Sequence, residues 1–332
     1  MDPLDQQIFD IFTRDIPGVV AAICLTILLV YGFLNRNMPR VGGKLGRRAP
    51  YPPADPPPQG FSRVDCRHIV TYLAPAEPDR YATLKTYLRE GTQARTELVH
   101  VYRVAGCRTR IEVPAGPPHY ERIDAAEALA LWRELPDPRL VWRLHLSDEP
   151  AFLDPWWRRL SGRNDIFHQG HANNLGLVVI YLPDRRLGPM LGTILVHEWA
   201  HLLAYRKPRA VRRFKRANKI EPLPPLPMPL TYDHPVLRVH ETWAELGEKL
   251  LGYDDKLARE AALQAPVHAM ILWRCVEKSL RKTPKRLAST RRDEFKARGV
   301  FMRAEVAPKA RAVRRSRRWW RRLYASMTGA HP

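Results

Sequence analysis

The sequence contains only four cysteines among its 332 residues, and no two of them form a CxxC pair. This absence argues against a zinc site built from thiolates and against a disulfide framework. We therefore predict free, mostly buried thiols and a reducing compartment, with a Cys66–Cys107 pair as the alternative for an exported domain. The four are Cys24, Cys66, Cys107 and Cys275.

Acidic residues are also in deficit. The chain has 34 Asp and Glu against 55 Lys and Arg, which is a formal net charge of +21. An excess of this size favours anionic partners, namely a phospholipid surface, nucleic acid or acidic protein. The length suits one large domain or two small ones.

An uncharged run covers residues 16–34, after a short acidic N-terminal tail of residues 1–15. Its length approaches the ~20 residues that a helix needs to cross a bilayer. The run has no clear basic start and no clear small-residue cleavage site, which are the marks of a signal peptide. We predict one transmembrane helix here, and a buried core helix is the alternative.

The flanks of this run predict its orientation. Five Lys or Arg follow it closely, between residues 36 and 48, whereas a single Arg precedes it. By the positive-inside tendency, the N-terminus lies outside and the bulk of the chain is cytoplasmic. Residues 35–62 are rich in Pro and Gly and are predicted to form an extended linker.

The pattern of residues 63–277 predicts a globular domain of mixed strands and helices, which is an α+β fold. Gly106 predicts a hairpin turn between the second and third strands, and Asp124 with Glu127 predicts a capped helix start. The expected strands are Arg67–Leu73, Glu97–Val104, Arg108–Val113, Leu140–Leu146 and Leu175–Leu182; the expected helices are Asp79–Glu90, Ile123–Leu135, Asp154–Arg163 and a helix that opens near Pro235 and stops at Gly252.

The most informative stretch is GTILVHEWAHLLAY, residues 192–205. At helical pitch His197 and His201 lie one turn apart on the same face, so both imidazoles reach one metal ion. Glu198 is turned about 100° away along the rim of that face. The flanking residues are uncharged, as in a buried helix. The stretch predicts a metal site, and the alternative is a buried helix with two satisfied histidines.

Two histidines do not complete a catalytic zinc site, which normally has three protein ligands and a water. The downstream candidates for the third ligand are His234, His240, Glu241, Glu245 and Glu248. His168 and His171, in the HQGH segment, are predicted to be loop residues rather than ligands, because no helix frames them.

The HEWAH segment, followed by a helix that carries ETWAE, resembles the gluzincin branch of zinc metallopeptidases, in its compact form. The resemblance covers about residues 173–252, and it implies a zincin-like domain, in which a mixed sheet supports an active-site helix and a following glutamate helix. It also implies that His197, His201 and Glu241 bind Zn²⁺ and that Glu245 supports one histidine. His240 and His234 remain alternatives to Glu241. The longer HExxHxxGxxH motif of the metzincins is absent.

A site of this kind predicts a peptidase that acts on protein or peptide substrates. Glu198 is expected to act as the general base that takes a proton from the zinc-activated water. Tyr232 and His234 are candidates for the donor that stabilises the oxyanion. The apolar segment Leu175–Leu182 is either an edge strand that pairs with an extended substrate or an ordinary central strand.

The C-terminal tail, residues 278–332, is strongly basic. From Lys278 to Arg322 it has 18 Lys or Arg against three acids, with Trp319, Trp320 and Tyr324 among the arginines. We predict a solvated tail that contacts anionic lipid, with nucleic acid as the alternative partner. Two other functions stay open, which are an inactive zincin-fold membrane scaffold and a nucleic-acid-associated HExxH protease such as the SprT-like enzymes.

Overall fold

The computed structural model describes residues 57–73, 93–118, 120–148, 151–152, 167–222, 235–287 and 291–328. The chain divides by its internal contacts into residues 1–53 and 54–332, and all of the described residues belong to the second unit. The predicted tail 1–15, the predicted span 16–34 and most of the predicted linker lie outside the described residues. Within the described ranges, no helix combines the length and the apolar character that a membrane crossing requires.

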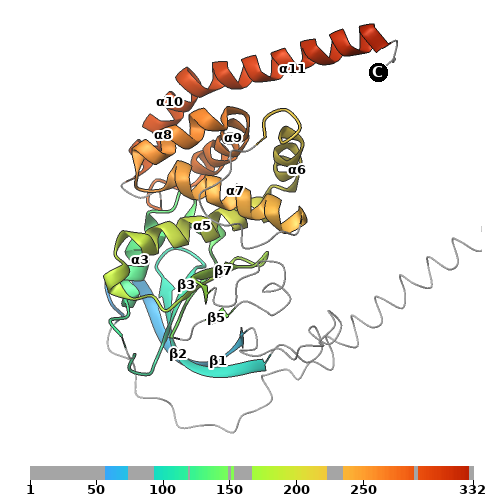
Figure 1. Ribbon diagram of the computed structural model, residues 1–332. Coiled ribbons are helices and arrows are strands. Elements are labelled where there is room, and N and C mark those ends of the chain that lie inside the picture. The colour runs from blue at the N-terminus through green and yellow to red at the C-terminus, as the bar shows by residue number, and fades with distance from the viewer. Residues whose placement is uncertain are drawn as a thin grey trace, which may run out of the picture. The chain divides into compact units, whose positions relative to one another are not determined.

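A six-stranded mixed sheet forms one layer of the domain (Figure 1). Its strands stand in the order β1-β2-β3-β4-β8-β7. The first three are antiparallel, β4 and β8 continue parallel to β3, and β7 is antiparallel to β8. The strands are β1 Phe61–Leu73, β2 Gln93–Val104, β3 Arg110–Pro114, β4 Arg143–Ser147, β7 Gly170–Ala172 and β8 Leu177–Tyr181; a separate pair joins β5 Ala151–Phe152 to β6 Phe167–His168.

The predicted hairpin around Gly106 is confirmed, since β2 and β3 pair antiparallel. Gly106 has a φ of 74°, a backbone conformation that glycine adopts without steric cost. The Pro-rich segment before β1 ends earlier than predicted, because Phe61 is buried and starts the first strand.

One helix, α3 Ala125–Arg133, lies between β3 and β4 in the chain, and its predicted capping box of Asp124 and Glu127 is confirmed. In the described part of the chain, seven further helices follow the last strand of the sheet. Proline stands at the start of α5, α6 and α9, where its missing N–H costs nothing. The domain is therefore an α+β domain. The seven are α5 Pro189–Arg206, α6 Pro208–Ala217, α7 Pro235–Leu251, α8 Asp255–Gln264, α9 Pro266–Lys282, α10 Arg292–Phe301 and α11 Ala307–Thr328.

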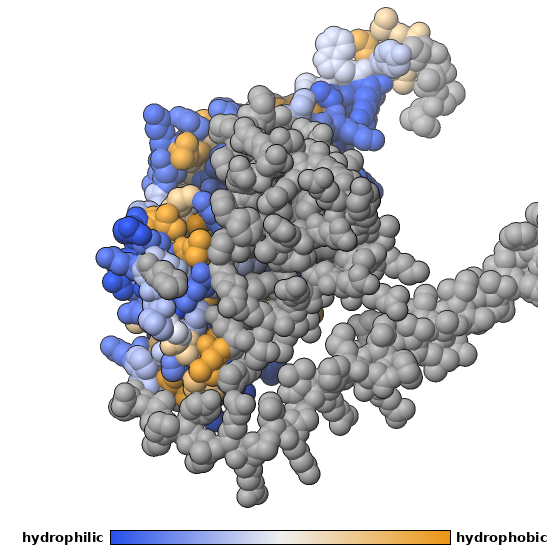
Figure 2. All heavy atoms as spheres, turned by 60° about the horizontal axis from the view of Figure 1, so that its bottom comes forward, coloured by the Kyte–Doolittle hydropathy of each residue, from blue (hydrophilic) through white to orange (hydrophobic). Residues whose placement is uncertain are grey.

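Most of the described residues after Lys278 lie in helices rather than in the predicted solvated tail. Phe295 of α10 is buried, as are Met302 and Val306 in the short π-helix Met302–Val306 that joins α10 to α11. This apolar stripe packs on α9, which explains why so basic a segment folds. The far part of α11 is exposed and largely hydrophilic, with a few hydrophobic residues at its end (Figure 2).

Glu112 of β3 is a buried carboxylate that links β3 to β4 at the centre of the sheet. Its two oxygens accept hydrogen bonds of 2.9 and 2.8 Å from Arg143 of β4, and His145 Nδ1 lies 3.4 Å away. Burial alone would raise the pKa of Glu112, but the hydrogen bonds and charges of His145 and Arg143 outweigh burial and lower the pKa to about 2. The charged form is therefore the one that the fold stabilises.

This depressed pKa predicts an acid-sensitive contribution to stability. The contribution is complete above pH 4.5, the ordinary pKa, and about 3 kcal/mol is lost as the pH falls to about 2. The difference in free energy of unfolding between the native chain and Glu112→Gln is thus expected to shrink over this window, as measured by denaturant titration. Glu260→Gln, an exposed carboxylate on α8, is the control; equal pH dependence of both variants would contradict the prediction.

Candidate metal centre

Helix α5, which carries the HEWAH segment, lies between the sheet and α7 (Figure 1). Between Leu191 and Ala204 its apolar residues are buried, among them Leu195, Trp199 and Leu203, and this is why the middle of the helix has no polar face. The Trp199 indole N–H donates to the carbonyl of Asp137 at 2.9 Å, which holds the helix against the sheet layer. The two motif histidines are therefore carried on a fixed support.

Helix α7 packs closely against α5 at Gly247. A Cβ atom added to Gly247 would lie 2.7 Å from the Cβ of Ala200, so only glycine allows this approach. The buried Trp243 indole donates to the carbonyl of Ala200 at 3.0 Å and joins the same two helices. This contact brings the acidic residues of α7 to the histidines of α5.

The structure brings His197, His201 and Glu241 together. Glu241 Oε2 lies 3.5 Å from His197 Nε2 and 3.6 Å from His201 Nε2. One ligand atom from each residue lies within 4.8 Å of the others, which is the one such group in the described part of the chain. Ligands held at about 2 Å from a tetrahedral zinc ion are about 3.3 Å apart. The three donors therefore fit a single divalent cation.

The electrostatics of the group favour a positive charge. Burial would lower the pKa of His197, but hydrogen bonds to Glu241 and Glu248 outweigh it and raise the pKa to about 10. Burial would likewise raise the pKa of Glu241, but the hydrogen bonds and charges of His197 and His201 outweigh burial and lower the pKa strongly. A place that stabilises a proton between carboxylates also suits a metal cation, which competes with that proton.

Glu198 lies beside this group as a buried carboxylate, with 6% of its surface exposed. Burial raises its pKa, against the opposing charges of His201 and His197. A Cβ atom on Gly170 of β7 would lie 2.7 Å from Glu198 Oε1, so a glycine backbone borders the carboxylate. A carboxylate with a raised pKa, held beside a cation site, is suited to accept and return a proton.

The structure differs from the prediction for Glu245. Its side chain pairs with Lys249 at 3.2 Å, and the carboxylate beside the histidine is that of Glu248, whose Oε2 lies 2.9 Å from His197 Nδ1. Seven residues are almost two complete helical turns, so Glu248 returns to the stripe of Glu241 and meets the preceding turn of α5. This spacing was visible in the sequence, but the crossing of the two helices was not.

These contacts predict different roles for the two glutamates. Glu248→Gln is expected to weaken metal affinity by roughly 10- to 100-fold, because the carboxylate that orients His197 loses its charge. Glu245→Gln, the same substitution one turn away, is expected to change the affinity by less than about threefold. Competition with a chromophoric chelator measures both. A larger loss in Glu245→Gln would restore the role that the resemblance to the gluzincins implies for Glu245.

Other candidate ligands lie apart from the group. His240 packs its ring against Tyr205, with centroids 5.6 Å apart, and it does not belong to the metal group. Tyr232 and His234 lie outside the described residues. His171 is a strand residue rather than a loop residue, and it does not belong to the metal group. Burial and the charge of His201 lower its pKa, and the charge of Glu241 raises it by less, so the net shift is downward. A strand of three residues gives too short a pattern for sequence analysis to find.

The apolar segment predicted as a strand, β8, is a central strand. It pairs with β4 on one side and with β7 on the other. The edge of the sheet next to α5 is β7 itself, whose Gly170 borders Glu198. The edge strand beside the candidate metal centre is therefore β7 rather than β8.

The fold and the site define an α+β protein with a candidate His–His–Glu metal centre. In comparisons with known proteins, no family model, no curated protein and no solved structure matches the chain.

Proposed function

We propose that this protein is a zinc-dependent metallopeptidase of the gluzincin-like type, with a zincin-like catalytic domain. The observation that carries the proposal is the convergence of His197, His201 and Glu241 beside the buried carboxylate of Glu198. Two imidazoles and one carboxylate also bind iron(II) in oxygenases. A buried general base at the rim is what a hydrolase needs, and it favours zinc.

In this proposal different residues of the chain have different roles in hydrolysis. Bound zinc would lower the pKa of a coordinated water and polarise the substrate carbonyl. Glu198 accepts the proton of the attacking water on its carboxylate and returns it to the leaving amine. Glu248 holds the Nδ1 side of His197, which leaves Nε2 directed at Glu241. The edge strand β7 aligns the main chain of an extended peptide beside Glu198.

We further propose that residues 16–34 anchor the catalytic domain to a membrane, with the N-terminus outside and the domain in the cytoplasm. The support is the length of the uncharged run and the basic residues that follow it. Protease protection of an N-terminal tag in intact cells tests the orientation, because only an outside N-terminus is cleaved.

The function itself is tested by hydrolysis of an unfolded protein such as casein by the purified full chain. Activity is expected to disappear with a chelator and to return with zinc. Measured zinc close to one ion per chain, together with no hydrolysis of any peptide substrate, would favour an inactive scaffold instead.

A further inference from the structure

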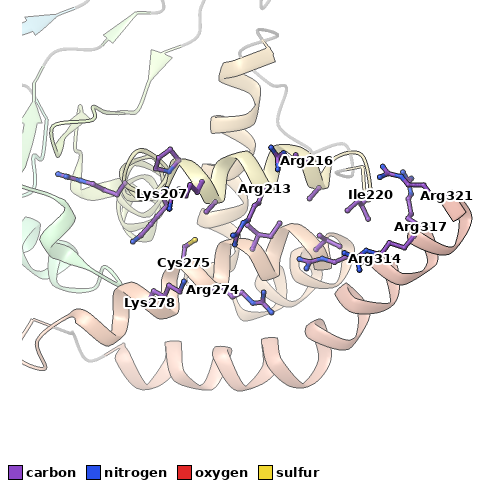
Figure 3. Close-up of a pocket in the computed structure, with 18 residues that line it drawn as sticks. Lys207, Arg213, Arg216, Ile220, Arg274, Cys275, Lys278, Arg314, Arg317 and Arg321 are labelled. Atoms are coloured by element: carbon purple, nitrogen blue, oxygen red, sulfur yellow. The ribbon is translucent and has the colours of Figure 1, made fainter. Parts of the chain in front are cut away.

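A basic cleft lies between α6, α9 and α11, on residues that take no part in the metal centre (Figure 3). Its volume is about 1000 Å³, and eleven of its 18 lining residues are Arg or Lys. None of the 18 is Asp or Glu. The lining therefore carries cationic side chains and no carboxylate among its 18 residues.

The cations of the cleft face one another. Arg213 of α6, Arg274 of α9 and Arg314 of α11 extend toward the space between the helices (Figure 3). Burial lowers the pKa of Arg314, and the charges of Arg274, Arg318 and Arg213 lower it further, whereas the nearby carboxylate of Glu221 raises it by less, so the net shift is downward. The arrangement costs free energy when the cleft holds only water, and an anion would remove that cost.

Part of the lining of the cleft is apolar and includes Ile220, Val267 and Ile271. Apolar walls exclude water and strengthen the attraction between the arginines and an anion. Nine of the eleven cations are arginines, whose planar guanidinium groups bind phosphate with two parallel hydrogen bonds. The lining thus suits phosphate better than a single carboxylate.

The shape and the lining also limit the size of the ligand. The volume matches the upper end of small-molecule pockets, which is about 1000 Å³. None of the 18 described residues that line the cleft is aromatic, whereas single-stranded nucleic acid is usually bound by stacking its bases on aromatic rings. From these observations we propose that the cleft binds a compact anion that carries several phosphate groups.

The test is calorimetric titration of the purified full chain in a non-ionic detergent. Two probes separate the sources of such an anion, namely myo-inositol hexakisphosphate and a soluble short-chain phosphatidylinositol bisphosphate. Binding of the first alone assigns a soluble ligand, and binding of the second, alone or with the first, assigns a lipid headgroup. Saturable binding is expected to weaken as the salt concentration rises, because each contact is a charge pair.

The triple variant Arg213→Gln, Arg274→Gln, Arg314→Gln removes one cation from each helix and is expected to weaken binding on the order of 100-fold. The matched control is Arg212→Gln, Arg281→Gln, Arg315→Gln, which changes the same three helices at exposed positions outside the lining. The control is expected to bind within about threefold of the native chain. The single variants Arg274→Gln and Arg281→Gln repeat the comparison, so that a folding defect in the triple variant does not decide the result.

Three results would overturn the proposal. They are the absence of saturable binding of either probe, an equal loss of affinity in the two triple variants, and tighter cleft-dependent binding of a short single-stranded oligonucleotide. None of these results bears on the metal centre, because the cleft and the proposed peptidase site share no residue.

Discussion

Replacement of Glu198 by glutamine is expected to lower kcat for peptide hydrolysis by about 100- to 10,000-fold while the protein keeps its zinc. Glutamine has nearly the same shape as glutamate, so the packing around this buried position is preserved. The amide of glutamine cannot accept a proton from the attacking water, so general-base catalysis of the attack is lost. Hydrolysis of a fluorogenic peptide and metal analysis of the same sample measure the two quantities.

This experiment distinguishes a peptidase from a metal-binding scaffold. Full activity of Glu198→Gln would dismiss the proposed mechanism, whereas loss of zinc together with activity would show only that the site had collapsed. A suitable control is Glu277→Gln on α9. The Glu277 carboxylate pairs with Arg303, and neither residue belongs to the metal group. That variant is expected to keep both zinc and activity.

Replacement of Glu241 by alanine is expected to reduce the zinc content from about one ion per chain to nearly none. A catalytic zinc site with three protein ligands loses one of them, so the fall in affinity should exceed the roughly 10- to 100-fold that is typical of an outer-shell partner. The variant should also lose the increase in thermal stability that added zinc gives the native chain, because binding to the folded state is the source of that increase.

The neighbouring residue provides the control. His240→Ala removes the alternative third ligand, and it is expected to keep its zinc because this side chain packs against Tyr205 outside the group. Metal analysis after gel filtration compares the two variants directly. Zinc retained in Glu241→Ala and lost in His240→Ala would exchange the two assignments and require a rearrangement of the start of α7.

Local patterns predicted much of what positions the centre. The charge-free frame of HEWAH predicts a buried helix with two histidines on one face, and the structure has that helix as α5. The capping residues Asp124 and Glu127, the turn at Gly106 and the following glutamate helix were equally visible, because each depends on neighbours within a few residues.

Features that depend on distant contacts were not visible in this way. The resemblance to the gluzincins implies Glu245 beside a histidine, whereas the structure places Glu248 beside His197. Both residues return to the face of Glu241, so helical periodicity alone does not choose between them. The choice depends on where α7 crosses α5, which is set by the contact of Gly247 with Ala200. The basic cleft is likewise an arrangement of three separate helices.

The sequence by itself determined the candidate metal-binding helix and the carboxylate at its rim, because both follow from spacing along one helix, and the resemblance to the gluzincins indicated the helix that carries the third candidate donor. Only the tertiary structure decided which acid orients His197, which strand forms the edge beside Glu198, and that the C-terminal arginines gather around a cleft. The physical reason is that periodicity gives the face on which a side chain lies, whereas the packing of one element on another gives its neighbour.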